Sequence, residues 1–211
     1  MITGLSAPEH STPCDLIVGI GNPGKDYADT RHNAGVWFVD ALIARFGGRY
    51  KSEKKFHGRL ATVVVASREV RVLVPDTYMN DSGKSVSALS NFFKIAPESI
   101  LVAHDEIDFP PGKMRFKQNG GFAGHNGLRD ISRMMSGSAM FNRLRIGVGH
   151  PGHQTGVTGH VLGKVPKKDR VKIDTCIQDA ITAVPLAVKG DWQGAMQYLH
   201  NLEQPYQGGD G

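Results

Sequence analysis

Apolar and polar positions follow one another along this chain in a pattern that predicts short buried strands separated by helices. Two continuous apolar runs bounded by turn residues, at 15–20 and 100–103, are typical of strands covered on both faces. The runs 60–66 and 70–74 are rich in β-branched residues and are joined by residues 67–69, which predicts an antiparallel hairpin. The sheet is therefore expected to contain antiparallel as well as fully buried strands.

Helical spacing fills the intervals between these strands. Asn33 can cap a helix that runs to Phe46 and is stopped by Gly47. A second helix opens at Asp81 or Ser82. The later elements are predicted as a strand at 113–116, a helix at 126–135, a strand at 143–148, a helical stretch at 173–188 interrupted by Pro185, and a last helix at 192–200.

This order of elements predicts an α/β fold, a single globular domain with a mixed β-sheet flanked by helices. A chain of 211 residues has the size of one ordinary domain. We assign the domain to residues 14–200, and we expect residues 1–13 to be a disordered extension and residues 201–211 a flexible tail. Binding sites in such sheets gather at the carboxyl ends of the strands, where the sequence has His104, Asp105 and Glu106.

Composition narrows the class of protein. The apolar runs are about five residues long, far short of the roughly 20 needed to cross a bilayer. Residues 1–13 lack the basic start and apolar stretch of a secretory signal. Cys14 and Cys176 have no CxxC spacing, so they indicate neither a disulfide framework nor a thiolate metal site. We therefore expect a cytoplasmic protein with no membrane partner.

The net charge of +5 is concentrated in one segment of the chain. Between Pro110 and His150 there are seven basic residues and one acid, Asp130, which gives +6 for this segment and leaves the rest close to neutral. The basic residues are Lys113, Arg115, Lys117, Arg129, Arg133, Arg143 and Arg145. Such clustering is typical of a surface that binds phosphate, although a merely solvated face gives the same pattern. Nucleic acid is therefore a candidate partner.

His32 is the residue best suited to general-base chemistry. It lies in the polar sequence Thr-Arg-His-Asn between the first strand and its helix, and histidine is the side chain that exchanges a proton most readily near neutral pH. A base also needs an orienting group. Asp105, at the end of a different strand, could hold the other imidazole nitrogen. A helix cap or a surface turn is the alternative role for Asp105.

Asn22, Asn80 and Asn126 each stand beside otherwise distinctive residues. A carboxamide can donate to a developing oxyanion and accept from a peptide N–H, which suits attack by water on an ester that carries an acylated amine. A cap or a turn is the alternative role for each. The chain has no GxSxG motif, and neither cysteine is near His32 in sequence. Direct attack by water is therefore simpler than covalent catalysis.

The sequence from Gly19 to Gly24 matches GxGxxG after a strand, which raises the alternative of a dinucleotide-binding site. That site needs a helix to begin at the loop, and here about eight polar residues intervene. Asp40, the acid at the appropriate distance, falls inside a predicted helix and could not reach a ribose. A tight turn is the better interpretation of these glycines.

A metal site is a further alternative, because His150, His153 and His160 follow one strand and residues 104–106 follow another. The spacing is not HExxH, and the Pro and Gly between the first two histidines place them on a turn. We therefore predict that the protein uses no metal ion and no other cofactor.

Several ordered motifs together resemble bacterial peptidyl-tRNA hydrolases. They are Gly-Asn-Pro-Gly at 21–24, Tyr27, Thr-Arg-His-Asn-Ala-Gly at 30–35, Thr-Tyr-Met-Asn at 77–80, His-Asp-Glu at 104–106, Gly-His-Asn-Gly-Leu at 124–128 and Arg-Ile-Gly-Val-Gly-His-Pro-Gly at 145–152. The similarity extends from about Cys14 to His200. The resemblance implies a monomeric α/β protein with a twisted mixed sheet that needs no metal.

The resemblance also implies a role for each matching residue. His32 would be the catalytic base, Asp105 would keep it in the proton-accepting form, and Asn22 would help to distinguish blocked from free aminoacyl-tRNA. The positions that match residues binding the tRNA end or its acyl group, or lining the same cleft, are Tyr27, Tyr78, Met79, Asn80, His125 and Asn126. Lys117 and Arg145 match the clamp for the 5′-terminal phosphate, which would explain part of the basic excess.

The expected activity is hydrolysis of the ester between a peptide or N-blocked amino acid and the 3′ ribose of tRNA, which recycles tRNA. The partner would be peptidyl-tRNA, bound at its acceptor end and 5′ phosphate. A non-catalytic RNA-binding protein on the same scaffold and a metal-dependent amidase are the alternatives. The Gly-rich run departs from the family pattern at Asn119, Phe122 and Ala123, which leaves the mobility of that loop open.

Overall fold

A computed structural model describes residues 12–152 and 156–202 of the chain. Its strands are β1 (Leu16–Gly19), β2 (Lys51–Glu53), β3 (Gly58–Val65), β4 (Arg68–Pro75), β5 (Ile100–Glu106), β6 (Met114–Lys117) and β7 (Asn142–Gly147). Its α-helices are α1 (Ala34–Phe46), α2 (Ser82–Phe93), α3 (Asn126–Met134), α4 (Val157–Val161), α5 (Lys167–Val188) and α6 (Trp192–Leu202). The strands form one sheet in the order β2-β3-β4-β1-β5-β7-β6.

Parallel and antiparallel pairing are segregated within the sheet. The four central strands β4, β1, β5 and β7 run parallel, whereas β2 and β3 on one side and β6 on the other pair antiparallel. The predicted α/β fold with a mixed sheet is thus confirmed. Because the central strands are parallel, their carboxyl ends lie along one edge, where ligands bind in sheets of this kind.

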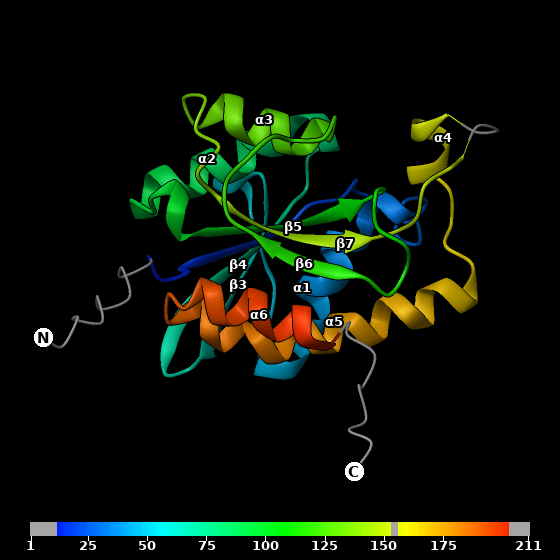
Figure 1. Ribbon diagram of the computed structural model, residues 1–211. Coiled ribbons are helices and arrows are strands. Elements are labelled where there is room, and N and C mark those ends of the chain that lie inside the picture. Colours follow the sequence, from blue (N-terminus) through cyan, green and yellow to red (C-terminus); the bar gives the residue numbers. More distant parts are fainter. Residues whose placement is uncertain (1–11, 153–155, 203–211) are drawn as a thin grey trace, which may run out of the picture.

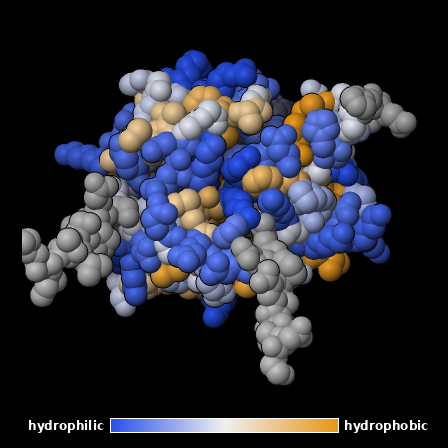
Figure 2. Space-filling view, viewed as in Figure 1, coloured by the Kyte–Doolittle hydropathy of each residue, from blue (hydrophilic) through white to orange (hydrophobic). Residues whose placement is uncertain are grey.

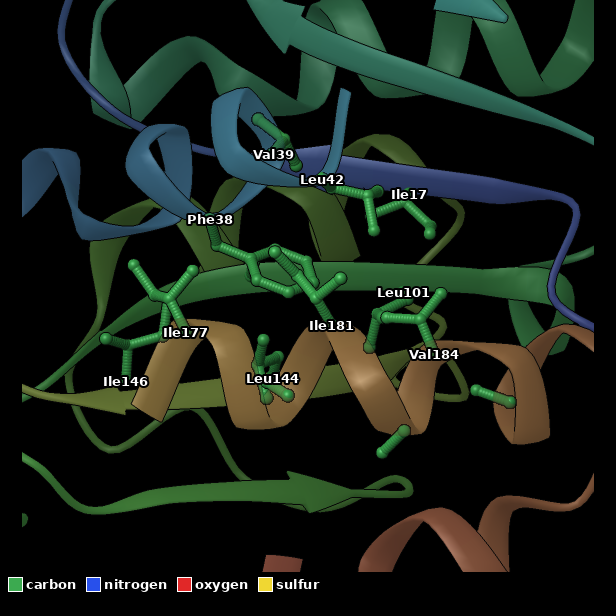
Figure 3. Close-up of a cluster of buried hydrophobic side chains, with 14 of the residues drawn as sticks. Ile17, Phe38, Val39, Leu42, Leu101, Leu144, Ile146, Ile177, Ile181 and Val184 are labelled. Carbon is green, nitrogen blue, oxygen red and sulfur yellow. The ribbon is translucent and has the colours of Figure 1, made fainter. Parts of the chain in front are cut away.

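Helices cover both faces of the sheet (Figure 1). On one face, α1, α5 and α6 enclose the larger apolar core, in which Phe38 of α1 and Ile177 and Ile181 of α5 pack against Leu101 and Leu144 of the sheet (Figure 3). On the other face, α2 and α3 enclose a smaller core. The continuous apolar runs of β1 and β5 follow from this arrangement, since alternate side chains enter opposite cores.

Several local predictions need correction. The hairpin turn occupies only Ala66 and Ser67, both with positive φ, so β4 already begins at Arg68 within the segment expected to be the turn. Helix α5 continues through Pro185 to Val188 instead of being interrupted, because buried apolar residues on both sides of the proline hold the helix to the sheet. Strand β2 and helix α4 were not predicted, since both are short and lack clear periodicity.

The terminal predictions fall largely outside the described residues. Of residues 1–13 and 201–211, only 12–13 and 201–202 are described. Thr12 accepts a hydrogen bond from the Trp192 indole at 2.8 Å, and residues 201–202 end α6. The extension and the tail therefore stay predictions. None of the helices among the described residues combines the length and apolar character needed to traverse a bilayer.

Candidate active site

A cavity of about 640 Å³ opens at the carboxyl edge of the parallel strands. Asn22 reaches it from the loop after β1, Met79 from the turn after β4, and Asp105 from the end of β5. His125 and Asn126 enter from the start of α3, and α4 forms the opposite wall. Five segments that are distant in sequence therefore converge at this edge, and three of them do so because β1, β4 and β5 are parallel neighbours in the sheet.

His32 reaches Asp105 because α1 lies unusually close to the sheet. A Cβ added to Gly35 would lie 2.1 Å from the carbonyl oxygen of Ala103, so only glycine allows this approach. The 3-10 turn Arg31–Asn33 that precedes α1 is thereby brought against the end of β5. The glycine of the Thr-Arg-His-Asn-Ala-Gly motif thus positions the histidine of the same motif.

The side chains of His32 and Asp105 form a direct hydrogen bond. Nδ1 of His32 lies 2.9 Å from Oδ1 of Asp105, and the two side chains are 14% and 2% exposed. Burial by itself would raise the pKa of Asp105, but the imidazoles of His125 and His32 outweigh it and hold the pKa well below its usual range. An ionised carboxylate only accepts hydrogen bonds, so Nδ1 of His32 carries a proton, and in the neutral imidazole Nε2 is therefore the nitrogen with the lone pair.

His125 binds the same carboxylate oxygen. Its Nε2 lies 2.9 Å from Oδ1 of Asp105, and its Nδ1 accepts the backbone N–H of Leu128 at 3.4 Å, which caps α3. Because that backbone group can only donate, Nε2 is the protonated nitrogen of His125. Both nitrogens of His125 are therefore engaged, whereas His32 keeps one basic nitrogen.

His104 is a third imidazole beside this pair, with its ring centroid 5.0 Å from that of His125. Burial lowers the pKa of His104 to about 3, so the ring is neutral at physiological pH. Its Nδ1 donates to the carbonyl oxygen of Asp105 at 2.8 Å. The backbone of Asp105 is thus held by His104 while its side chain holds the other two imidazoles.

The carboxamide of Asn22 has a defined orientation. Its Oδ1 accepts the backbone N–H of Met79 at 2.8 Å, so Nδ2 is left as a donor at the cavity. The backbone of Asn22 is fixed in turn by Asn33, whose Oδ1 accepts its N–H at 2.9 Å and whose Nδ2 donates to its carbonyl at 3.0 Å. The predicted capping role of Asn33 is wrong: it stands at the N-cap of α1, but its side chain bonds Asn22 instead.

Comparison with known proteins identifies the family of the chain. The family model described as Peptidyl-tRNA hydrolase matches residues 16–207. The chain belongs to the peptidyl-tRNA hydrolase family. It is 50% identical to the peptidyl-tRNA hydrolase of Azotobacter vinelandii over 190 residues, which cover 90% of this chain and 98% of the relative. It is 51% identical to that of Halorhodospira halophila over 185 residues, 88% of this chain and 95% of the relative.

A solved structure supports the same assignment. The crystal structure of peptidyl-tRNA hydrolase from Acinetobacter baumannii has a TM-score of 0.86 and 49% sequence identity, covering 90% of this chain and 96% of that chain. The family that the motifs indicated is therefore confirmed, and so is the hydrolase class that its name states.

Eight of the eleven residues expected in a peptidyl-tRNA hydrolase site line the cavity. They are Asn22, His32, Tyr78, Met79, Asn80, Asp105, His125 and Asn126. Tyr27 lies just outside, in an edge-to-face contact with Tyr78 at a centroid distance of 6.4 Å. Asn80 and Asn126 are exposed at the cavity rim. The structure thus brings these residues together, while their roles stay proposals.

Lys117 and Arg145, the expected phosphate clamp of the family, lie outside the cavity on β6 and β7. Their register pairs Arg115 with Arg145 and Lys117 with Arg143, so four cations share one face of these two strands. Nε of Arg145 donates to the buried Glu106 carboxylate at 2.8 Å. Arg143 instead donates to the carbonyls of Gly120 and Gly121 and thereby holds the Gly-rich loop.

The motifs that raised the alternatives of a dinucleotide site and a metal site have structural roles in the peptidyl-tRNA hydrolase fold. Helix α1 begins ten residues after Gly24, and Asp40 accepts a hydrogen bond from the Tyr50 hydroxyl at the surface. The side chain of His160 bonds the Gly149 carbonyl at 2.6 Å, and His150 accepts from the Gly152 N–H. His153 is outside the described residues.

A different triad has the spacing of a metal site. Within the part of the chain that the structure describes, ligand atoms of His32, Asp105 and His125 lie within 4.8 Å of one another. These three side chains form the two hydrogen bonds described above, so a metal ion bound through the hydrogen-bonding atoms would replace both bonds. The three side chains have the chemistry to bind a cation. In the hydrogen-bonded arrangement, by contrast, Nε2 of His32 is free to accept a proton.

The apolar half of the cavity was not predicted from the sequence. Phe122 lies nearly parallel to Phe141 at a centroid distance of 6.3 Å and anchors the Gly-rich loop. The opposite wall consists of Val157, Val161 and Leu162 of the α4 segment together with Ile107. A five-residue helix with β-branched residues has too little periodicity to be predicted, and Phe122 was noted only as a departure from the family pattern.

Proposed function

We propose that this protein hydrolyses the ester that joins a peptide or an N-blocked amino acid to the 3′ ribose of tRNA. The observation that carries the proposal is the hydrogen bond between Nδ1 of His32 and Oδ1 of Asp105 inside the cavity. Family membership supports the same reaction.

His32 acts in this proposal as the general base. Its free Nε2 takes a proton from a water molecule whose oxygen attacks the ester carbonyl carbon. When the tetrahedral intermediate collapses, the C–O bond to the ribose breaks, and the proton passes from the imidazolium to the departing 3′ oxygen. One water is consumed, a carboxylic acid and a ribose hydroxyl are released, and His32 is neutral again.

The negative charge that develops on the carbonyl oxygen needs a donor. Nδ2 of Asn22 suits this role because Oδ1 is already committed to the Met79 N–H. Asn80 is the second candidate donor, at the rim of the same cavity. Asn22 would also bind the carbonyl of a blocked amine, which a free aminoacyl-tRNA lacks.

The acceptor end of tRNA would lie across Tyr78, Tyr27, His125 and Asn126, with its 5′ phosphate near Lys117 and Arg145. The edge-to-face pair of tyrosines, of which Tyr78 is exposed and Tyr27 half-buried, offers aromatic faces on which bases stack. The cation-bearing face of β6 and β7 supplies the charge for the phosphate. We include in the proposal that the protein acts as a monomer in the cytoplasm, where tRNA is used, and sedimentation of the free protein tests the monomer.

The direct test is turnover of N-acetyl-aminoacyl-tRNA by the His32→Ala variant. Loss of the base should lower turnover about 100-fold or more, while tRNA binding is kept. His57→Asn is the matched control, because His57 is exposed and its φ of 49° is a conformation that asparagine tolerates. Near-normal turnover by His32→Ala would refute the assignment.

Two further arms separate the alternatives. Binding of tRNA without ester release by the intact protein would favour a non-catalytic RNA-binding protein. Loss of activity in a chelator, restored by a divalent metal, would favour a metal-dependent enzyme built on His32, Asp105 and His125. The proposal expects hydrolysis that a chelator does not change and that is much faster for blocked than for free aminoacyl-tRNA.

A further inference from the structure

Arg31, the residue before His32, ties the catalytic loop to the opposite wall of the cavity. Its Nη1 lies 3.3, 3.3 and 3.0 Å from the carbonyl oxygens of His160, Gly163 and Lys164, at the end of α4. Its backbone N–H also donates to Gly163 at 3.2 Å. One side chain therefore binds three carbonyl oxygens at the carboxyl end of the helix, where a positive charge is favoured.

Helix α4 depends on such external support. It has five residues, far fewer than the 12–15 that an isolated helix needs to be even marginally stable. Gly163 is fitted to Arg31, because a Cβ there would lie 3.2 Å from Nη1. The backbone bridge between Thr30 and Lys164 adds a second tie to the same loop.

The face of α4 that borders the cavity is apolar and partly uncovered. Val157 and Leu162 are 48% and 39% exposed, and Val161 and Thr158 complete the wall. Figure 2 shows an orange area between the positions that Figure 1 gives to α3 and α4. These four side chains carry no charge, so a charged group placed against them would lose hydration without gaining an ion pair.

We propose that Arg31 is a positioning residue that holds α4 as an apolar wall, and that this wall favours substrates whose esterified amino acid has an apolar side chain. The inference rests on the proposed function. The same cavity contains His32 and the wall, and the side chain of the esterified residue begins only two bonds from the carbonyl carbon at which His32 acts. An ester held at His32 must therefore present that side chain to the cavity walls.

The first experiment tests, without any substrate, whether Arg31 stabilises α4. Hydrogen exchange is measured on the full chain and on Arg31→Met and Arg31→Lys. The amides of His160, Leu162 and Gly163 bond within the α4 segment, so their exchange should be faster in Arg31→Met by at least 10-fold and less so in Arg31→Lys. Unchanged exchange in Arg31→Met would overturn the inference, even if the protein were inactive on every ester.

The second experiment measures kcat/KM for N-acetyl-leucyl-tRNA and N-acetyl-glycyl-tRNA, matched in tRNA sequence. Arg31→Met should lower the leucyl-to-glycyl ratio about 10-fold, mainly through KM, since an apolar contact discriminates by roughly this factor. Leu162→Ala should lower the same ratio. Combining the two changes should add little to either alone, because both act through one wall.

Arg45→Met, on the exposed side of α1, is the matched control for loss of an arginine, and its ratio should stay at the wild-type value. Equal losses on both esters in Arg31→Met would show that Arg31 serves folding or chemistry in general, which overturns the selectivity. Failure of the wild-type protein to cleave either ester would instead refute the proposed function. The hydrogen-exchange experiment would still test whether Arg31 holds α4.

Discussion

The two halves of β5 are almost equally buried but differ completely in chemistry. Ile100, Leu101, Val102 and Ala103 are fully buried and enter the two apolar cores, whereas His104, Asp105 and Glu106 are 3–4% exposed and polar. Burial alone therefore does not distinguish the core of this protein from its site. The difference lies in the partners that each half meets.

The apolar half is matched by whatever hydrophobic side chains cover it, while the polar half needs specific hydrogen-bonding groups. Asp105 meets His32 and His125, and Glu106 meets Arg145. All three partners come from elements distant in sequence from β5. The contrast teaches that the two carboxylates of the site depend on partners that only the tertiary structure brings to them.

The largest effect is expected when the charge of the polar half is removed. Asp105→Asn keeps the size of the side chain but removes the negative charge that stabilises His32 after it takes a proton. Turnover of N-acetyl-aminoacyl-tRNA should fall about 1000-fold, as measured by ester release. The control is Asp40→Asn, a surface acid on α1, for which wild-type turnover is expected. A variant of Asp105 with more than a tenth of normal turnover would contradict the mechanism.

The apolar half should respond in stability instead. Leu101→Ala leaves a void in the larger core (Figure 3), which should lower the free energy of unfolding by about 2–5 kcal/mol. Urea titration measures the loss, and turnover per folded molecule should stay normal. Leu202→Ala, at a side chain that is 52% exposed, should change the free energy by about 0.5 kcal/mol or less. Similar losses at both positions would contradict the comparison.

The buried His104 makes the free energy of unfolding depend on pH. Its folded pKa of about 3 lies below its unfolded value of 6.5, so below pH 6.5 the unfolded chain binds a proton that the folded protein excludes. The free energy of unfolding is therefore highest above pH 6.5 and decreases as the pH falls toward 3. The decrease is about 2 kcal/mol between pH 6.5 and 5. His104→Asn should flatten this part of the urea-midpoint profile. A profile that keeps the wild-type slope would exclude His104 as its source.

The smallest effect separates two roles of His125. Asparagine is a preferred N-cap residue, so His125→Asn should keep the cap of α3 while its shorter side chain loses Asp105. Turnover should fall about 10-fold, as for other groups that orient a functional side chain. The thermal midpoint should move by no more than a few degrees, which differential scanning calorimetry can check. Normal turnover would mean that His125 serves only the helix.

Much of the fold could be predicted because its determinants are local. The β-branched runs, the apolar run of β5 and the Gly47 stop of α1 depend on neighbouring residues, and the structure places these elements within a few residues of the predicted bounds. Prediction was wrong at Pro185 and at the hairpin turn, where tertiary packing and two residues with positive φ outweigh the local preference.

The sequence predicted which residues form the site better than it predicted how they are arranged. Motifs resembling a known family named His32, Asp105 and Asn22, but nothing local indicates that Asn33 fixes the backbone of Asn22 or that Gly35 brings α1 to within contact of Ala103. The wall formed by α4 was missed for the same reason. Arg31, which binds the carbonyls at the end of α4, is far from them in the sequence.

By itself, the sequence determined the order of elements, the family and the identity of the polar cavity residues that carry the proposed chemistry, since these follow from periodicity and short motifs. Only the tertiary structure decided which nitrogen of His32 is basic, which end of the Asn22 amide is the donor, and what closes the cavity. Protonation and amide orientation depend on the group that lies about 3 Å away, and that group comes from another strand or helix. Parallel pairing of β1, β4 and β5 is what brings those groups within reach.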